Sequence, residues 1–154
     1  MRLRSQRRFT QLQRGVAAVE LALILPFLLI LISAPLFFGR VFWHYTVIQK
    51  AAHDSAMYLS RISAGEMRTP VHASAAAAVA RDIALAEMAD LNTGLYAPSI
   101  TVLCGTYICD GLAIPKTVRV AIRAEIQDPI FGSIYAGEGV LISSDVTLAY
   151  NAAN

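Results

Sequence analysis

The sequence predicts an α+β protein in which a membrane-spanning helix is followed by further helix and then by a small antiparallel sheet. Three observations lead to this fold class. The stretch from Leu21 to Gly39 is 19 residues long and carries no charge. After it, apolar residues recur at steps of three and four, which is typical of helix, up to about residue 91. From residue 99 onward the period becomes two, which is typical of strands with one buried face.

The composition excludes several classes of protein. Of the 154 residues, 56% are apolar and only 16% are charged, and the mean hydropathy is +0.51. These values do not fit a disordered chain, a nucleic-acid-binding tail or an ordinary cytosolic enzyme. The net charge of +2 averages two unlike parts. Five arginines and no acid precede Val16, whereas eight basic and eleven acidic residues lie from Val16 onward.

We predict that residues 16–39 form a transmembrane helix, with Leu21, Pro26 and Gly39 inside the span. As a helix, the uncharged stretch would be roughly 28 Å long, close to the hydrocarbon thickness of about 30 Å. Only a helix can cross there, since lipid offers the backbone no hydrogen-bond partner, and prolines are tolerated in such helices. The alternative is a buried core helix, but so short a chain can hardly enclose so apolar a segment.

The flanks of this stretch predict its orientation. Positive charge stays on the cytoplasmic side, so the arginine-rich N-terminus is expected inside the cell and the residues after about Arg40 outside. The residues at the end of the span and just after it, from Phe37 to Trp43, are mostly bulky and do not resemble a secretory cleavage site. We therefore expect the helix to be retained.

The junction before the span contains a lone acid, Glu20, five positions after Gly15. A carboxylate in a membrane helix costs about 2.5–3.5 kcal/mol at the centre and less near the interface, so a compensating charge is expected. If a peptidase cut after Gly15, Val16 would present a new ammonium group that Glu20 could pair with, in its own chain or a neighbouring one. The alternative, which the residues favour equally, is an uncut anchor whose Glu20 lies among lipid head groups.

These residues resemble the TadE-like proteins, which are pseudopilins of tight-adherence (Flp, type IVb) pilus systems. The resemblance covers about residues 14–60 and includes an Ala-rich helix after the span, with a weaker similarity in the tail at Ile130–Gly132 and Val140–Tyr150. In that helix His53, Ser55 and Met57 replace more usual residues of the family. The motifs that carry the resemblance are Arg14-Gly15-Val16-Ala17-Ala18-Val19-Glu20, Leu21-Ala22-Leu23-Ile24-Leu25-Pro26, Phe38-Gly39-Arg40 and Gln49-Lys50-Ala51-Ala52.

The resemblance implies a basic prepilin-type leader, residues 1–15, that an inner-membrane prepilin peptidase removes after Gly15. Val16 would then become the mature N-terminus and Glu20 the fifth mature residue. Leu21 departs from the Phe or Tyr that usually follows this glutamate. The implied partners are the inner membrane, other pilins or pseudopilins and the pilus assembly platform. The implied location is the bacterial inner membrane, with a periplasmic body, and entry into an extracellular pilus stays open.

The body divides into a helical part, residues 40–94, and a β region, residues 95–154. An apolar stripe runs from Val41 to Ile62; it packs either on its own domain, which we favour, or on partner helices as a stalk. A break is expected at residues 63–66, followed by an N-cap at Thr69 and a helix over residues 71–91 that stops at 92–94. Strands are expected at 99–103, 117–126 and 140–150, joined by short connections into an antiparallel sheet that packs on a helix, as in pilin-like proteins.

The two cysteines, Cys104 and Cys109, flank a candidate tight turn at Gly105-Thr106. Since the body is expected in an oxidising space, we predict a disulfide rather than two free thiols. A metal site is not expected, because two cysteines without a nearby histidine fall short of four ligands.

Catalytic motifs are missing from the sequence. His44, His53 and His72 are scattered, and we expect them on the solvated surface. No hydrolase, zinc-protease or P-loop pattern occurs, and no basic aromatic face suits nucleic acid. We therefore expect no enzyme activity, no cofactor, no metal, no nucleic acid and no small-molecule substrate. Three hypotheses remain: a minor pseudopilin, an uncleaved single-pass anchor that presents a periplasmic binding module, and, least favoured, a membrane-tethered enzyme.

Overall fold

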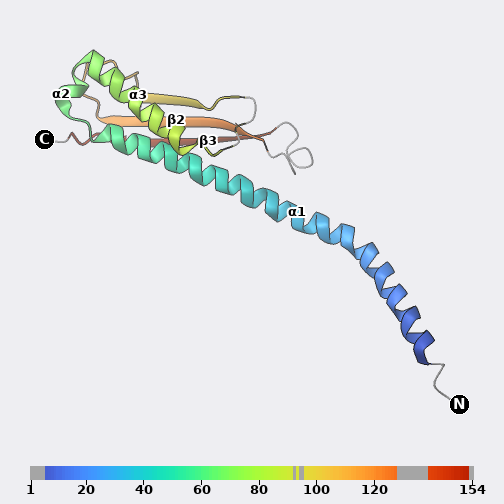
Figure 1. The fold of residues 1–154 in the computed structure, drawn as a ribbon. Helices are drawn as coiled ribbons and strands as arrows, with labels where there is room; N and C mark the ends of the chain where they lie inside the picture. The colour runs from blue at the N-terminus through green and yellow to red at the C-terminus, as the bar shows by residue number, and fades with distance from the viewer. Residues whose placement is uncertain (1–5, 92, 94–95, 128–138, 153–154) are drawn as a thin grey trace. The chain divides into compact units, whose positions relative to one another are not determined.

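The computed structural model describes residues 6–91, 93, 96–127 and 139–152, with side chains from Gly15 onward. The chain forms two compact units, residues 1–38 and 39–154. Helix α1, Gln6–Ser60, begins in the first unit and ends in the second (Figure 1). The fold class predicted from the sequence is confirmed: a long apolar helix, further helix and then an antiparallel sheet.

In the first unit α1 is the only element among the described residues, and it includes both Pro26 and Pro35. Proline removes a backbone donor and crowds the preceding turn, yet the helix continues through both positions. The hydroxyl of Ser33 donates to the carbonyl of Ile30 at 2.8 Å, so this polar group bonds within the helix itself.

In the second unit the last part of α1 is followed by α2, Ala64–Met67, and α3, Pro70–Glu87. Three strands complete the body: β1, Ser99–Cys104, β2, Thr117–Ile126, and β3, Val140–Ala149. They form an antiparallel sheet in the order β1-β2-β3. The register between β2 and β3 runs without interruption from Thr117 opposite Ala149 to Ile126 opposite Val140.

The core lies between the helices and one face of this sheet. Alternate residues of β2 point inward, and Val118, Val120 and Ile122 are fully buried. From α1 the fully buried side chains include Ile48, and from α3 they include Ala84. Helices α1 and α3 therefore cover the same face of the sheet (Figure 1), and the apolar stripe of α1 packs on its own domain, as favoured from the sequence.

The end of the sheet is tied to the end of α1. The backbone N–H of Asn151 donates to the carbonyl of Ser60 at 3.1 Å, and the hydroxyl of Tyr150 donates to the carbonyl of Ile62 at 2.7 Å. The last carbonyls of a helix have no partner within the helix. Here the chain that leaves β3 supplies partners at and just beyond the helix end.

Several boundaries differ from the prediction: β1 ends at Cys104 and not at residue 103, β3 ends at Ala149 and not at residue 150, and the helices differ more. Helix α1 ends at Ser60, and the expected break at residues 63–66 contains the single turn α2. Ser63 caps α2 by accepting from the N–H of Glu66 at 3.3 Å and donating to its carboxylate at 2.9 Å. One turn is too short to show an apolar period, so the pattern missed it.

Helix α3 begins at Pro70 after the N-cap residue Thr69, as predicted, but ends at Glu87, short of residue 91. Backbone turns follow, with the N–H of Leu91 donating to the carbonyl of Met88 at 2.9 Å. The predicted stop falls partly, at residues 92 and 94, outside the described residues, and so does the similarity noted at 130–132.

Candidate functional site

The predicted processing residues lie on an open stretch of α1. Gly15 is helical, and a side chain added there would meet nothing within 4 Å. Val16 is 60% exposed, and Glu20 is also exposed. No ion pair joins Glu20 to another residue in the part of the chain that the structure describes. Because α1 is continuous here, Val16 and Glu20 lie one turn apart on the same side of the helix.

Helix α1 from Gly15 onward is the one described helix long and apolar enough to cross a membrane, with a mean hydropathy of 2.7 in its most apolar window. Large apolar side chains of this stretch are exposed over much of their surface: Leu23 by 67%, Phe27 by 75% and Leu31 by 72%. Monomeric soluble proteins rarely expose apolar patches of this extent. The helix is therefore consistent with a single membrane anchor.

The first turns of α1 in the second unit contain a histidine whose exposure was predicted incorrectly. His44 is only 2% exposed, so the expectation of a solvated surface residue is incorrect for this histidine, although His53 and His72 are exposed. Its Nδ1 lies 2.7 Å from the carbonyl oxygen of Arg40, to which it donates. His44 is buried because it lies on the buried side of α1, one helical turn before Ile48. The type of residue does not decide its burial.

The far end of the body holds the predicted disulfide, which the structure confirms between Cys104 and Cys109, with their Cα atoms 4.9 Å apart. The tight turn is also where it was expected. Gly105 adopts a positive φ of 74°, and the N–H of Cys104 donates to the carbonyl of Tyr107 at 2.8 Å. Cys109 belongs to the same buried cluster as Leu59, which lies about 30 Å along α1 from Gly39.

The loop that the disulfide closes continues across the start of α3. Gly111 has a φ of 72°, and a side chain there would come within 2.6 Å of the backbone nitrogen of Pro70. Only glycine tolerates both the conformation and the close approach. The carboxylate of Asp110 accepts from the N–H of Leu112 at 3.1 Å, which adds a local turn. The disulfide, the two glycines and this turn hold the loop in one shape.

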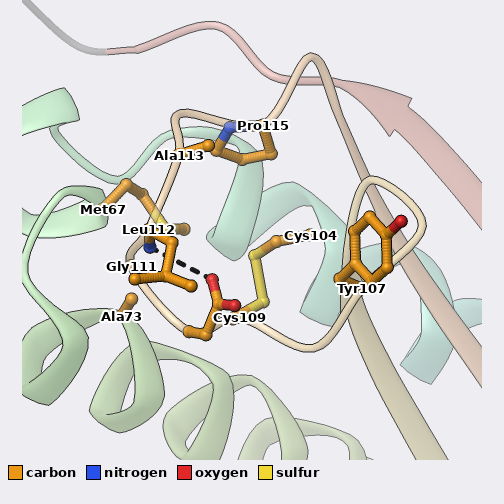
Figure 2. A pocket seen from close by; sticks show the side chains of 10 residues that line it. Met67, Ala73, Cys104, Tyr107, Cys109, Gly111, Leu112, Ala113 and Pro115 are labelled. Atoms are coloured by element: carbon orange, nitrogen blue, oxygen red, sulfur yellow. Dashed lines mark hydrogen bonds between the residues drawn. A yellow bond between two sulfur atoms is a disulfide. The ribbon is translucent and has the colours of Figure 1, made fainter.

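A groove of about 350 Å³ lies between this loop and the helices (Figure 2). Its lining is mostly apolar and includes Met67, Ala73 and the disulfide itself. The loop also exposes large side chains: Tyr107 by 75%, Ile108 by 71% and Leu112 by 83%. Its lining includes one carboxylate, that of Asp110, and one phenol, that of Tyr107. The mostly apolar lining suits an apolar group.

The outer face of the sheet carries charged side chains. The guanidinium of Arg119 is bonded through two of its nitrogens to the carboxylate of Asp145 on the neighbouring strand. This hydrogen bonding lowers the pKa of Asp145 below its usual value. Both side chains are nearly half exposed, so the pair adds little to stability. Among the described residues, no group of three or more His, Cys, Asp or Glu side chains could hold a metal ion.

The structure thus keeps the predicted site residues apart. Gly15, Val16 and Glu20 lie near the start of α1, Leu21, Pro26 and Gly39 follow along the same helix, and the disulfide lies in the body. Sequence reasoning missed the groove and the close approach of Gly111 to α3. The signal in the sequence was the glycine and the proline that enclose three apolar residues in segment 111–115. This pattern indicates a turn, but it does not show that the turn packs against α3.

Comparison with known proteins gives a family match that lies entirely within α1. A model of the TadE-like protein family matches residues 15–57. This segment contains the Gly15–Glu20 junction, the uncharged stretch and the part of α1 that packs on the sheet. No curated protein and no solved structure matches the chain. Over residues 15–57 the chain is therefore similar to the TadE-like protein family, the resemblance that the N-terminal motif predicted.

Proposed function

We propose that this protein is a minor pseudopilin of a tight-adherence (type IVb) pilus, made as a precursor and cut after Gly15. Similarity to the TadE-like family implies a role in Tad pilus assembly, and the exposed apolar helix that the family match covers is the observation that carries the proposal. The protein acts through helix–helix and protein–protein contacts. Its partners are the prepilin peptidase, other pilins or pseudopilins and the assembly platform.

The membrane arrangement follows from charge. Five arginines precede Val16, and between Leu21 and Gly39 there is no charge. With the positive end retained in the cytoplasm, the helix crosses the inner membrane once and the body faces the periplasm. An oxidising periplasm agrees with the disulfide between Cys104 and Cys109.

Cleavage at Gly15 requires local unwinding, because peptidases bind extended chain and Gly15 lies within α1. Glycine favours this, since it costs about 1 kcal/mol relative to alanine inside a helix and fits a narrow cleft. The new ammonium group at Val16 would lie one helical turn from the carboxylate of Glu20. Pairing of these charges, within the chain or between neighbours, would mask both in lipid.

Intact mass of the protein extracted from its native membrane tests the cleavage. We expect a chain that starts at Val16, and we expect Gly15→Leu to leave a precursor that is 15 residues longer. Gly39→Leu is the matched control, because Gly39 is also helical and has nothing within 4 Å of an added side chain. An intact leader in the wild-type protein would favour the uncleaved anchor with a periplasmic binding module.

The charge pair is tested separately by pilus assembly. Glu20→Gln keeps the size and polarity of the side chain but removes the charge, so membrane insertion should survive while pilus yield falls. Glu87→Gln is the control, because Glu87 is a partly exposed acid of the body that pairs with Lys50. Normal piliation with Glu20→Gln would refute the charge pairing without touching the anchor.

A further inference from the structure

The first turns of α1 in the second unit are two-sided. Phe42 is 67% exposed, Trp43 is 51% exposed and Tyr45 is 39% exposed. On the other side of the same turns His44 and Ile48 are buried, and Ile48 contributes to the core beneath the sheet. Phe42 and Tyr45 lie one turn apart with their ring centroids 6.5 Å apart, whereas Trp43 lies further around the helix with its ring 5.0 Å from that of His44. We call these three exposed rings, Phe42, Trp43 and Tyr45, the aromatic face.

Few charges lie near this face. Arg40, three positions before Trp43, is partly exposed, and from Val41 to Gln49 no aspartate, glutamate, lysine or arginine occurs. The hydroxyl of Thr46, which is also exposed, donates to the carbonyl of Trp43 at 2.7 Å, so its hydrogen bond is made within the helix. The next charged side chain is Lys50, which is held by Asp54 at 3.2 Å and by Glu87. Three large exposed rings in a segment so poor in charge are an unfavourable surface to leave in water.

The face follows closely on the uncharged stretch that ends at Gly39, with Arg40 between them. Along a helix, residues 42–45 lie about 5–9 Å beyond residue 39. This matches the layer of head groups, since a bilayer of about 40–45 Å has a hydrocarbon core of about 30 Å. The indole N–H and the phenol hydroxyl suit this layer, where one side of the ring contacts acyl chains and the polar tip meets water.

We propose that the aromatic face binds the lipid head-group layer at the end of the membrane span. The inference rests on the membrane span of the proposed function.

Trp43 is the one tryptophan of the chain, so its fluorescence reports the depth of this face. The experiment uses the full-length protein in phosphatidylcholine–phosphatidylglycerol vesicles whose acyl chains are brominated either near the head group or near the chain end. We expect blue-shifted emission and loss of most of the intensity with bromine near the head group, with a smaller loss for bromine near the chain end. Phe42→Ser combined with Tyr45→Ser should reduce the first loss.

The matched control moves the reporter to the far end of the body. In the double variant Trp43→Tyr with Tyr107→Trp, the indole replaces another exposed ring, and we expect no bromine quenching and ready quenching by aqueous acrylamide.

Vesicles are washed at alkaline pH to test the span independently. If the chain stays in the washed vesicles but Trp43 behaves like the control, the proposal is wrong and the span stands. If Trp43 is shielded from acrylamide but not quenched by bromine, a protein covers the face, and the proposal is also wrong. If the wash removes the chain, both the span and the proposal fail.

Discussion

Gly111 and Gly105 form a natural pair for testing how the distal loop is held. Both adopt a positive φ, of 72° and 74°, but only Gly111 approaches another segment. A side chain at Gly111 would come within 2.6 Å of the nitrogen of Pro70 and 2.7 Å of the carbonyl carbon of Thr69, whereas Gly105 has nothing within 4 Å. Because the obstacles are backbone atoms at the start of α3, they cannot turn aside as a flexible side chain would.

The expected magnitudes follow from these two terms. The left-handed conformation costs an alanine about 1–2 kcal/mol, and this cost applies to Gly105→Ala and Gly111→Ala alike. Forcing a methyl group against a closely packed neighbour adds about 1–3 kcal/mol, and this applies to Gly111→Ala alone. The free energy of unfolding should therefore fall by about 1–2 kcal/mol in the first variant and by about 2–5 kcal/mol in the second.

Urea unfolding of the full-length protein in a mild detergent measures both values. Near-ultraviolet circular dichroism reports the aromatic side chains of the body, and no reductant is added, so that the disulfide stays formed. The slope against urea should be the same for wild type and both variants, which makes the midpoints comparable. Equal destabilisation by the two substitutions would refute the reasoning, because the close approach to α3 would then contribute nothing.

Three further predictions concern the body. Replacement of both Cys104 and Cys109 by serine should lower the free energy of unfolding by about 2 kcal/mol, because the bridge closes a loop of only five steps in sequence; urea midpoints of the oxidised wild type and the variant check this. Tyr150→Phe should cost about 1 kcal/mol near neutral pH, because it removes the 2.7 Å hydrogen bond to the carbonyl of Ile62. Burial raises the pKa of Tyr150 above 10.0, so the stability linked to its neutral hydroxyl is complete below pH 10 and is lost as the pH rises through the raised pKa. The stability difference between wild type and Tyr150→Phe should therefore shrink above pH 10, and a constant difference in melts at pH 8 to 11.5 would contradict this. Ser55→Ala should raise the free energy of unfolding by about 1 kcal/mol, since the Ser55 hydroxyl is buried without a hydrogen-bond partner among the described residues; a lower urea midpoint would show that it has one.

Helical and strand elements could be predicted well because their signals are local. The uncharged stretch at Leu21–Gly39, the proline after Thr69 and the alternation in Thr117–Ile126 each act within a few residues. Boundaries were less accurate at α2 and at the end of α3. There the chain makes isolated turns, and a period cannot be recognised over so few residues.

The candidate site was predictable only in part. The disulfide could be foreseen because its cysteines are close in sequence and flank a glycine. The burial of His44 could not, because it depends on which side of α1 the sheet covers. The groove beside the loop was equally hidden, since Met67 and Ala73 reach it from elements distant in sequence from Cys109.

The sequence by itself determined that this chain has an apolar helix with a basic start, a helical segment and three alternating strands. These features depend on short-range sterics and on the free energy of removing apolar side chains from water. Only the tertiary structure decided that α1 and α3 share one face of the sheet, that the aromatic face of α1 is left uncovered and that Gly111 meets the start of α3. Such contacts join residues far apart along the chain. They arise from the mutual fit of whole surfaces, which no local pattern of residues encodes.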